Sequence, residues 1–416
     1  MVLFFFSKKM RGFVSCEAFI STITDLNSAA HAHVQTLSSA RWWCAPMVEQ
    51  SELAFRRLVR SLGADVASTP MVKADAFVRS LRYRSSVSID GSSGARPAGD
   101  VIAIEGVGVP TLRVNIGDAQ DEPLVVQFCG DDPATLAAAC RLVDGKVAAV
   151  ELNLGCPQAC AAKGHYGSFL LDEADLVASI VAAMRAAAPR CAVLCKIRVL
   201  ETYEATLDVC RRVVEAGCDV LTVHGRTRAE KRSSVHLARW DWIARLARAL
   251  APCPVVANGN VRTRRDAEAC IAATGACGVM SASSLLRNPA LFAPGDRTYS
   301  RLQLALAYIY FARRDPPAPS TVALHVHGIL KGALLVALGP AFGAALQRLR
   351  TKRRSLKTDS ALSVLVRALE VATTDVALAA ALHRSAYLPA NSAEEESGLH
   401  IAARTRAEVG ARGGDE

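Results

Sequence analysis

Between residues 41 and 281, short apolar runs alternate with longer stretches that have helical spacing. Eight of the apolar runs have the length and the bounding residues of β-strands. Strands that alternate with helices predict parallel strands joined by crossover helices. The eight predicted strands end at Pro46, Pro70, Phe128, Asn153, Lys196, His224, Asn258 and Ser281.

Eight strand–helix units of this kind match a (β/α)8 barrel, the TIM barrel, whose typical length is about 250 residues. A doubly wound open sheet is the alternative architecture. The barrel is favoured because polar residues follow nearly every predicted strand, as they do around a barrel mouth. We therefore expect an α/β protein built on a TIM barrel.

The barrel is predicted to occupy residues 41–298, after an N-terminal extension at 1–40. Residues 85–121 contain a stretch rich in glycine and serine and predict a flexible insertion before the third strand. Helical patterns at 302–312, 322–337 and 361–371 predict a small all-helical domain over 299–390. The tail at 391–416 has few large apolar residues and is predicted to be disordered.

Composition narrows the class of protein. Hydrophobic residues make up 51% of the 416 residues, which is enough for a large core, and the net charge of +10 favours polyanionic partners. The 13 cysteines form no zinc-like Cys-x-x-Cys pairs, so we expect a reducing compartment and no bound metal. No run reaches the roughly 18 apolar residues of a membrane span, so none is expected.

The N-terminal apolar run is too short to predict a secretory signal. Basic residues outnumber acidic ones over 1–40, which leaves mitochondrial targeting open beside a poorly ordered extension. We expect a cytoplasmic or nuclear monomer.

Cys156 stands in the most informative part of the chain, in Asn-Leu-Gly-Cys-Pro at 153–157. A predicted strand ends at Asn153, Gly155 permits a sharp turn, and Pro157 delays the next helix. An isolated cysteine is more often a small buried apolar residue. Here the adjoining residues present the thiol at a strand end and favour a functional role.

The run at 153–157, followed by Gly-His-Tyr-Gly-Ser-Phe-Leu-Leu at 164–171, resembles the tRNA-dihydrouridine synthases. These flavoenzymes reduce uridine to dihydrouridine in tRNA. The continuation at Gln158 and the Lys163-Gly-His-Tyr-Gly stretch are most similar to the eukaryotic branch that acts on uridines 16 and 17 of the D-loop. The resemblance spans residues 43–292 and continues more weakly into the helical region.

The resemblance implies FMN and NADPH as cofactors and tRNA as the partner. A uridine would be flipped into the barrel mouth, hydride would pass from flavin N5 to uracil C6, and Cys156 would give a proton to C5. A thiol suits this role because its ordinary pKa of about 8.5 leaves it protonated near neutral pH. Asn153, Lys163 and Arg226 are the expected substrate contacts.

Flavin contacts are also implied at the strand ends. Gln127 in an apolar strand needs hydrogen-bond partners, which a flavin edge would supply, and an ammonium at Lys196 would stabilise reduced flavin. Loops after the seventh and eighth strands commonly bind phosphate. Taken singly, each residue is also compatible with a structural role. The full set is Pro46, Met47, Val48, Gln127, Lys196, His224, Asn258, Gly259, Asn260, Ala282 and Ser283.

The chain departs from the family after Met280, where a glycine is usual near the phosphate and this chain has Ser281-Ala-Ser-Ser. Because serine hydroxyls can bind phosphate, we expect FMN binding to survive. A basic cluster in the helical region would suit the tRNA backbone, with a solvated helix face as the alternative. It comprises Arg348, Arg350, Lys352, Arg353, Arg354 and Lys357.

Two other functions stay open from the sequence. One is a flavin barrel oxidoreductase that acts on a free small molecule, and the other is a tRNA-binding protein whose activity has lapsed.

Overall fold

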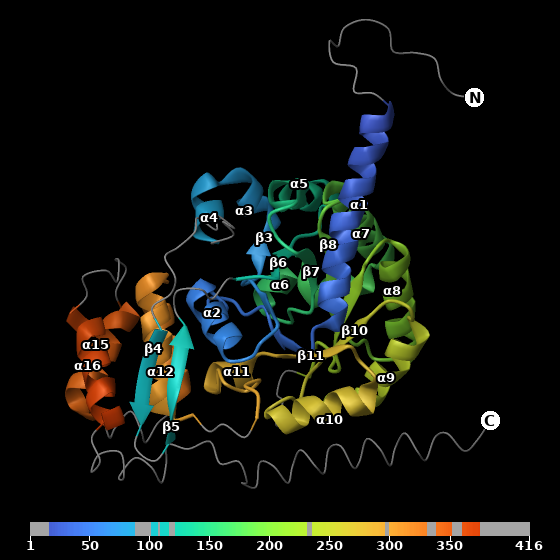
Figure 1. Ribbon diagram of the computed structural model, residues 1–416. Coiled ribbons are helices and arrows are strands. Elements are labelled where there is room, and N and C mark those ends of the chain that lie inside the picture. The colour runs from blue at the N-terminus through green and yellow to red at the C-terminus, as the bar shows by residue number, and fades with distance from the viewer. Residues whose placement is uncertain are drawn as a thin grey trace, which may run out of the picture.

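A closed barrel of parallel strands surrounded by helices forms the larger part of the structure, and a group of helices lies beside it (Figure 1). This computed structural model describes residues 16–87, 101–106, 109–115, 121–230, 235–295, 299–330, 338–351 and 360–374.

The barrel strands are β1 (Trp42–Cys44), β2 (Val66–Ser68), β6 (Leu124–Cys129), β7 (Ala149–Leu154), β8 (Ala192–Arg198), β9 (Val220–His224), β10 (Val255–Asn258) and β11 (Gly278–Ser281). They follow one another in the order β2-β1-β11-β10-β9-β8-β7-β6, and the pairing of β2 with β6 closes the ring. All of these pairings are parallel. The predicted TIM barrel is thus confirmed over the open sheet. A two-residue strand, β3 (Val72–Lys73), adds to β6.

The barrel strands are apolar and buried along nearly their whole length, as expected where helices cover a parallel sheet. Side chains cap several of these helices: Asp132 accepts a hydrogen bond from Thr135 at the start of α5, and Thr263 and Asp266 form a capping box on α10. The surrounding helices are α2 (Leu53–Ser61), α3 (Ala74–Arg79), α4 (Leu81–Ser86), α5 (Pro133–Val143), α7 (Ala174–Ala187), α8 (Tyr203–Glu215), α9 (Trp240–Ala249), α10 (Arg264–Thr274) and α11 (Ser283–Arg287).

Two segments contain secondary structure that the sequence analysis did not predict: the N-terminal extension and the insertion before the third strand. Helix α1 (Cys16–Ser39) occupies much of the predicted extension and contacts β8 and β9. Within the predicted insertion, β4 (Val101–Gly106) and β5 (Val109–Asn115) form an antiparallel pair. Gln303 of the helical region donates to the carbonyl of Ile104 at 2.8 Å, so this pair is attached to those helices. Residues 1–15, 88–100 and 116–120 lie outside the described residues.

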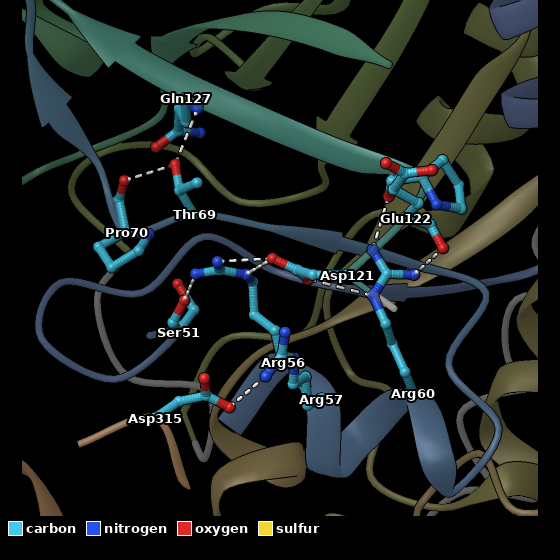
Figure 2. A network of polar contacts seen from close by, with 11 residues as sticks. Ser51, Arg56, Arg57, Arg60, Thr69, Pro70, Asp121, Glu122, Gln127 and Asp315 are labelled. Carbon is cyan, nitrogen blue, oxygen red and sulfur yellow. Dashed lines mark hydrogen bonds and ion pairs between the residues drawn. The ribbon is translucent and has the colours of Figure 1, made fainter. Parts of the chain in front are cut away.

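Helix α2 connects the barrel to the segment that precedes β6. Arg56 donates to Asp121 through Nη2 at 2.6 Å and Nε at 2.9 Å, and Arg60 also reaches this carboxylate at 3.3 Å (Figure 2). On the same helix, Arg57 pairs with Asp315 of the helical region. Helix α2 therefore links the barrel, the segment before β6 and the helical region.

The helical region contains α12 (Arg301–Arg314), α13 (Pro319–Leu330), α15 (Gly339–Thr351) and α16 (Ser360–Thr374). Of the predicted basic cluster, Arg348 and Arg350 are exposed on α15, and the other four residues lie outside the described part, as does the predicted tail. Among the described helices, none is both long enough and apolar enough to cross a membrane.

Candidate active site

The polar strand ends meet inside the barrel mouth. Lys196, two residues before the end of β8, donates from Nζ to Oδ1 of Asn258 at the end of β10, at 3.1 Å. Because β9 lies between these strands, the bond can form only across the inner face of the barrel. Asn153 is the cross-strand neighbour of Lys196 and belongs to the same inner layer. The structure thus brings three of the predicted residues together.

Cys156 follows β7 directly, and its backbone is held from two sides. The Oδ1 atom of Asn153 accepts hydrogen bonds from the N–H groups of Gly155 at 3.2 Å and Cys156 at 3.0 Å. The carbonyl of Cys156 accepts from Ser168 twice, from the backbone N–H at 3.1 Å and from Oγ at 3.0 Å. The two sequence motifs that carry the family resemblance are therefore in direct contact.

The thiol of Cys156 is half-buried beside a small apolar cluster that includes Cys129 and Tyr166. Burial raises the pKa of this thiol above its ordinary value and outweighs the lowering by the backbone N–H of Gln158 and by Arg198 and Lys196. The thiol is therefore protonated at neutral pH and can act as a proton donor.

Beneath this loop lies a buried carboxylate that the sequence analysis did not select. Gln127 donates from Nε2 to Oε2 of Glu151 at 2.7 Å, and Asn153 donates from Nδ2 to Oε1 of Gln127 at 2.6 Å. Burial raises the pKa of Glu151, while the positive charge of Lys196 opposes the rise. The sequence signal was present, because an acidic residue in an apolar strand needs a partner.

The amide of Gln127 has protein partners. Its side-chain amide bonds to Glu151 and Asn153. Separately, its backbone N–H donates to the hydroxyl of Thr69 at 3.2 Å (Figure 2). The predicted need for a flavin partner is therefore largely met within the protein, although one Nε2 hydrogen is left over.

Arg226 connects two of the predicted flavin ligands. It donates from Nη1 to Nε2 of His224 at 3.0 Å and from Nη2 to Oδ1 of Asn260, and its Nε donates to the carbonyl of His236 at 2.7 Å. A guanidinium has no acceptor, so Nε2 of His224 carries no proton. Burial and the charges of Lys196, Arg198 and Arg226 agree with this, since they lower the pKa of His224.

The loop after β10 has a conformation suited to glycine. Gly259 has φ of +117°, and a β-carbon there would come within 2.7 Å of Ala238 Cβ. Asn260 follows with φ of +61°, and among the described residues its buried Nδ2 has no hydrogen-bond partner. An amide donor is thus available in this loop.

The remaining predicted contacts lie on loops at the same edge. Met47 is buried and Val48 is exposed after β1, while Pro46 is half-buried. Ser281 donates from Oγ to the carbonyl of Val261 at 3.1 Å, so the hydrogen of this hydroxyl is already used within the protein. Ala282 is half-buried, Ser283 is exposed at the start of α11, and Lys163 is exposed at the end of α6 (Ala159–Lys163).

Arg198 is a second residue that the sequence analysis missed. It is buried and donates from Nε to the carbonyl of Gly155 at 2.9 Å and from Nη1 to the carbonyl of Thr227 at 2.9 Å. Its position two residues after Lys196 on the same strand was the available signal, because alternate residues share a face. Within the described residues, no group of three His, Cys, Asp or Glu side chains could hold a metal ion.

Comparison with known proteins agrees with this geometry. Residues 43–305 match the family described as dihydrouridine synthase (Dus). The chain belongs to the dihydrouridine synthase family, as the motifs predicted.

Three relatives illustrate the similarity. A Mus musculus protein named tRNA-dihydrouridine(16/17) synthase-like is 36% identical over 339 residues, covering 81% of this chain and 63% of the relative. The Saccharomyces cerevisiae tRNA-dihydrouridine(16/17) synthase [NAD(P)(+)] is 40% identical over 283 residues, covering 65% of this chain and 60% of the relative. A Mus musculus tRNA-dihydrouridine(20a/20b) synthase-like protein is 37% identical over 257 residues, covering 61% and 70%. The chain spans about three fifths of the length of the first two.

Proposed function

We propose that this protein reduces uridine to 5,6-dihydrouridine in tRNA at positions 16 and 17, with FMN as the bound flavin and NADPH as the reductant. The main support is the protonated thiol of Cys156 held beside the strand-end groups of the barrel mouth. The names of the mouse and yeast relatives support the choice of position and of a nicotinamide reductant.

The groups at the barrel mouth fit FMN. Lys196 supplies a cation, neutral His224 and Asn258 supply neutral polar groups, and Asn260 has a buried amide donor left over. Such a set suits the acceptor-rich edge of a flavin and its phosphate. When bound, FMN supplies the hydride that saturates the uracil ring.

Cys156 would hold the proton that C5 of the uracil receives. Asn153 and Ser168 hold the backbone of this residue, so its thiol keeps one direction relative to the mouth. Arg198 holds the carbonyl of Gly155 and further stiffens the turn. Positioning of this kind contributes strongly to catalysis, because misplacement of a reacting group by about 1 Å can cost 10²-fold.

The binding of tRNA is supported by basic groups near the mouth and on the helical region. Arg228, which pairs with Asp172 at 2.6 Å, lies over the ring of Phe169 at 5.4 Å and donates to the carbonyl of Ser168 at 3.3 Å, next to the Cys156 contact. Lys163 is exposed at the end of α6, and Arg348 and Arg350 are exposed on α15. These cations suit a phosphate backbone.

The deciding experiment is mass-spectrometric mapping of dihydrouridine in tRNA incubated with NADPH and the flavin-loaded protein. Cys156→Ala is expected to lower the rate about 10²-fold or more, because it removes a general acid. Cys160→Ala is the matched control, since this exposed cysteine lies four residues away on α6 and is expected to leave the rate unchanged.

Each alternative has its own outcome in this assay. Full dihydrouridine formation by Cys156→Ala removes the proton-donor assignment. Reduction of free uracil or oxidation of dihydroorotate without activity on tRNA favours a small-molecule oxidoreductase. A protein that binds tRNA but cannot be loaded with flavin favours lapsed activity.

A further inference from the structure

A continuous chain of hydrogen bonds runs from the barrel interior to the turn that carries Cys156. It passes from Glu151 to Gln127 at 2.7 Å, from Gln127 to Asn153 at 2.6 Å, and from Asn153 to the N–H groups of Gly155 and Cys156. Gln127 and Glu151 are cross-strand neighbours, and Asn153 lies two residues along β7. All three side chains therefore share the inner face.

Each amide in this chain has one donor end and one acceptor end, so its orientation needs an external reference. An ionised carboxylate only accepts, so Glu151 receives the NH₂ end of Gln127, and the positive charge of Lys196 favours this ionised form. In that orientation Oε1 of Gln127 faces Asn153 and accepts a hydrogen bond from the NH₂ group of Asn153. The acceptor Oδ1 of Asn153 is then left for the two N–H groups of the turn.

Reversing the two amides would cost much free energy, because both are buried. Glu151 and Gln127 are fully buried and Asn153 is 8% exposed, so water does not replace a lost bond. With Asn153 reversed, its NH₂ group would face the N–H groups of Gly155 and Cys156, and donors would oppose donors. Unsatisfied buried polar groups are costly, which makes one orientation strongly preferred.

We propose that Glu151 is a positioning residue: its carboxylate fixes the orientation of the Gln127 and Asn153 amides and so holds the Cys156 turn in place. The catalytic consequence rests on the proposed function, whereas the positioning of the turn does not. A buried carboxylate is unfavourable unless it has specific hydrogen-bond partners, which argues against a role in packing alone.

The test compares three proteins by the alkylation rate of Cys156 with iodoacetamide, followed by peptide mass spectrometry. Glu151→Gln replaces the acceptor-only group by one that can also donate, so the orientation is no longer dictated. The exchange variant Gln127→Glu/Glu151→Gln returns an acceptor-only group to the chain, because the carboxylate introduced at position 127 would accept from both the new amide at position 151 and Asn153. The direction of the hydrogen bonds is thus undetermined in Glu151→Gln and fixed again in the exchange variant.

Glu151→Gln is expected to raise the alkylation rate of Cys156 about fivefold, since the turn loses the equivalent of one hydrogen bond. The exchange variant is expected to restore the wild-type rate. Cys140 and Cys210, both buried on outer helices, report unfolding if they become reactive. An exchange variant that unfolds, or whose Cys156 reacts as fast as in Glu151→Gln, overturns the inference.

Steady-state kinetics provide the second measurement. Glu151→Gln is expected to lower kcat about tenfold and leave the KM for tRNA unchanged, because a displaced thiol affects the reaction and not the binding of tRNA. Glu204→Gln, the same substitution at an exposed position on α8, is the control and keeps the wild-type kcat. If the wild-type protein forms no dihydrouridine, the proposed function is wrong. The alkylation rates then still test the positioning role of Glu151.

Discussion

Gly167 lies against Cys156 so closely that a β-carbon at position 167 would be 2.7 Å from the carbonyl oxygen of Cys156. It would also be 3.0 Å from the β-carbon of Cys156. Gly167 has φ of +73°, a conformation that L side chains rarely adopt. The second glycine of the Gly-His-Tyr-Gly motif, Gly167, is therefore required by its own backbone conformation and by its close contact with Cys156.

Replacement of this glycine tests the contact. Gly167→Ala is expected to lower the free energy of unfolding by roughly 2–4 kcal/mol, from backbone strain and from displacement of the Cys156 carbonyl. It should also lower kcat, because the thiol moves with its backbone. Denaturant unfolding and dihydrouridine formation measure the two effects.

Gly275→Ala is the matched control for that substitution. Gly275 ends α10 with φ of +65°, and a β-carbon there would meet nothing within 4 Å. Gly275→Ala should lower the free energy of unfolding by about 1–2 kcal/mol from backbone strain alone and leave kcat unchanged. Equal losses of stability and activity in the two variants would show that contact with Cys156 has no part in the effect.

His165 connects two carboxylates on the outside of the same loop. Its Nδ1 lies 2.7 Å from Asp131 and its Nε2 lies 2.6 Å from Glu173. The hydrogen bonds to Asp131 and then Glu173 raise the pKa of His165 above its ordinary value of 6.5. Both ring nitrogens donate when the imidazole is charged, so this arrangement favours the cation.

The contribution of His165 to stability should depend on pH. Because its folded pKa is raised, the stabilisation is fully present below 6.5 and is lost as pH rises through the folded pKa. His165→Gln is therefore expected to lower the free energy of unfolding more at about pH 6 than at about pH 9. Equal losses at both pH values would contradict the charged bridge, and Asp131→Asn should reduce the difference between them.

Glu52 joins the barrel side of the structure to the helical region. The hydroxyl of Tyr308 donates to Oε1 of Glu52 at 2.8 Å, and Nε2 of His325 lies 3.0 Å from Oε2. Burial opposes ionisation of Glu52, but the charge of His325 and the hydrogen bonds from His325 and Tyr308 outweigh it and lower the pKa of Glu52. The buried carboxylate therefore depends on these donors.

Two tyrosines of α12 offer a matched test of this interface. Tyr308→Phe removes a donor from a buried carboxylate and is expected to cost about 1.5–3 kcal/mol of stability. Tyr310→Phe removes the same kind of bond, to Glu370 at 2.6 Å, at a more exposed position and should cost less than about 1 kcal/mol. Denaturant unfolding measures both, and equal costs would show that burial at Glu52 is unimportant.

The barrel could be predicted from sequence because its signals are local. A parallel strand covered on both faces is a short apolar run, and its end is marked by a polar or turn residue such as Asn153 or Lys196. The same reasoning placed Cys156 at a strand end. The β4–β5 pair escaped prediction because a run rich in glycine and serine precedes it, and because its attachment to the distant α12 leaves no local signal.

The sequence by itself determined the ends of the barrel strands to within two residues and which thiol follows β7, because neighbouring residues are enough to dictate both. Only the tertiary structure decided that Glu151 orients the amides below Cys156, that Arg226 joins His224 to Asn260, and that the Ser281 hydroxyl donates to the carbonyl of Val261. These partners are set by strand register around a closed ring. Residues far apart in the sequence become neighbours in the closed barrel, and no local sequence pattern predicts which of them are in contact.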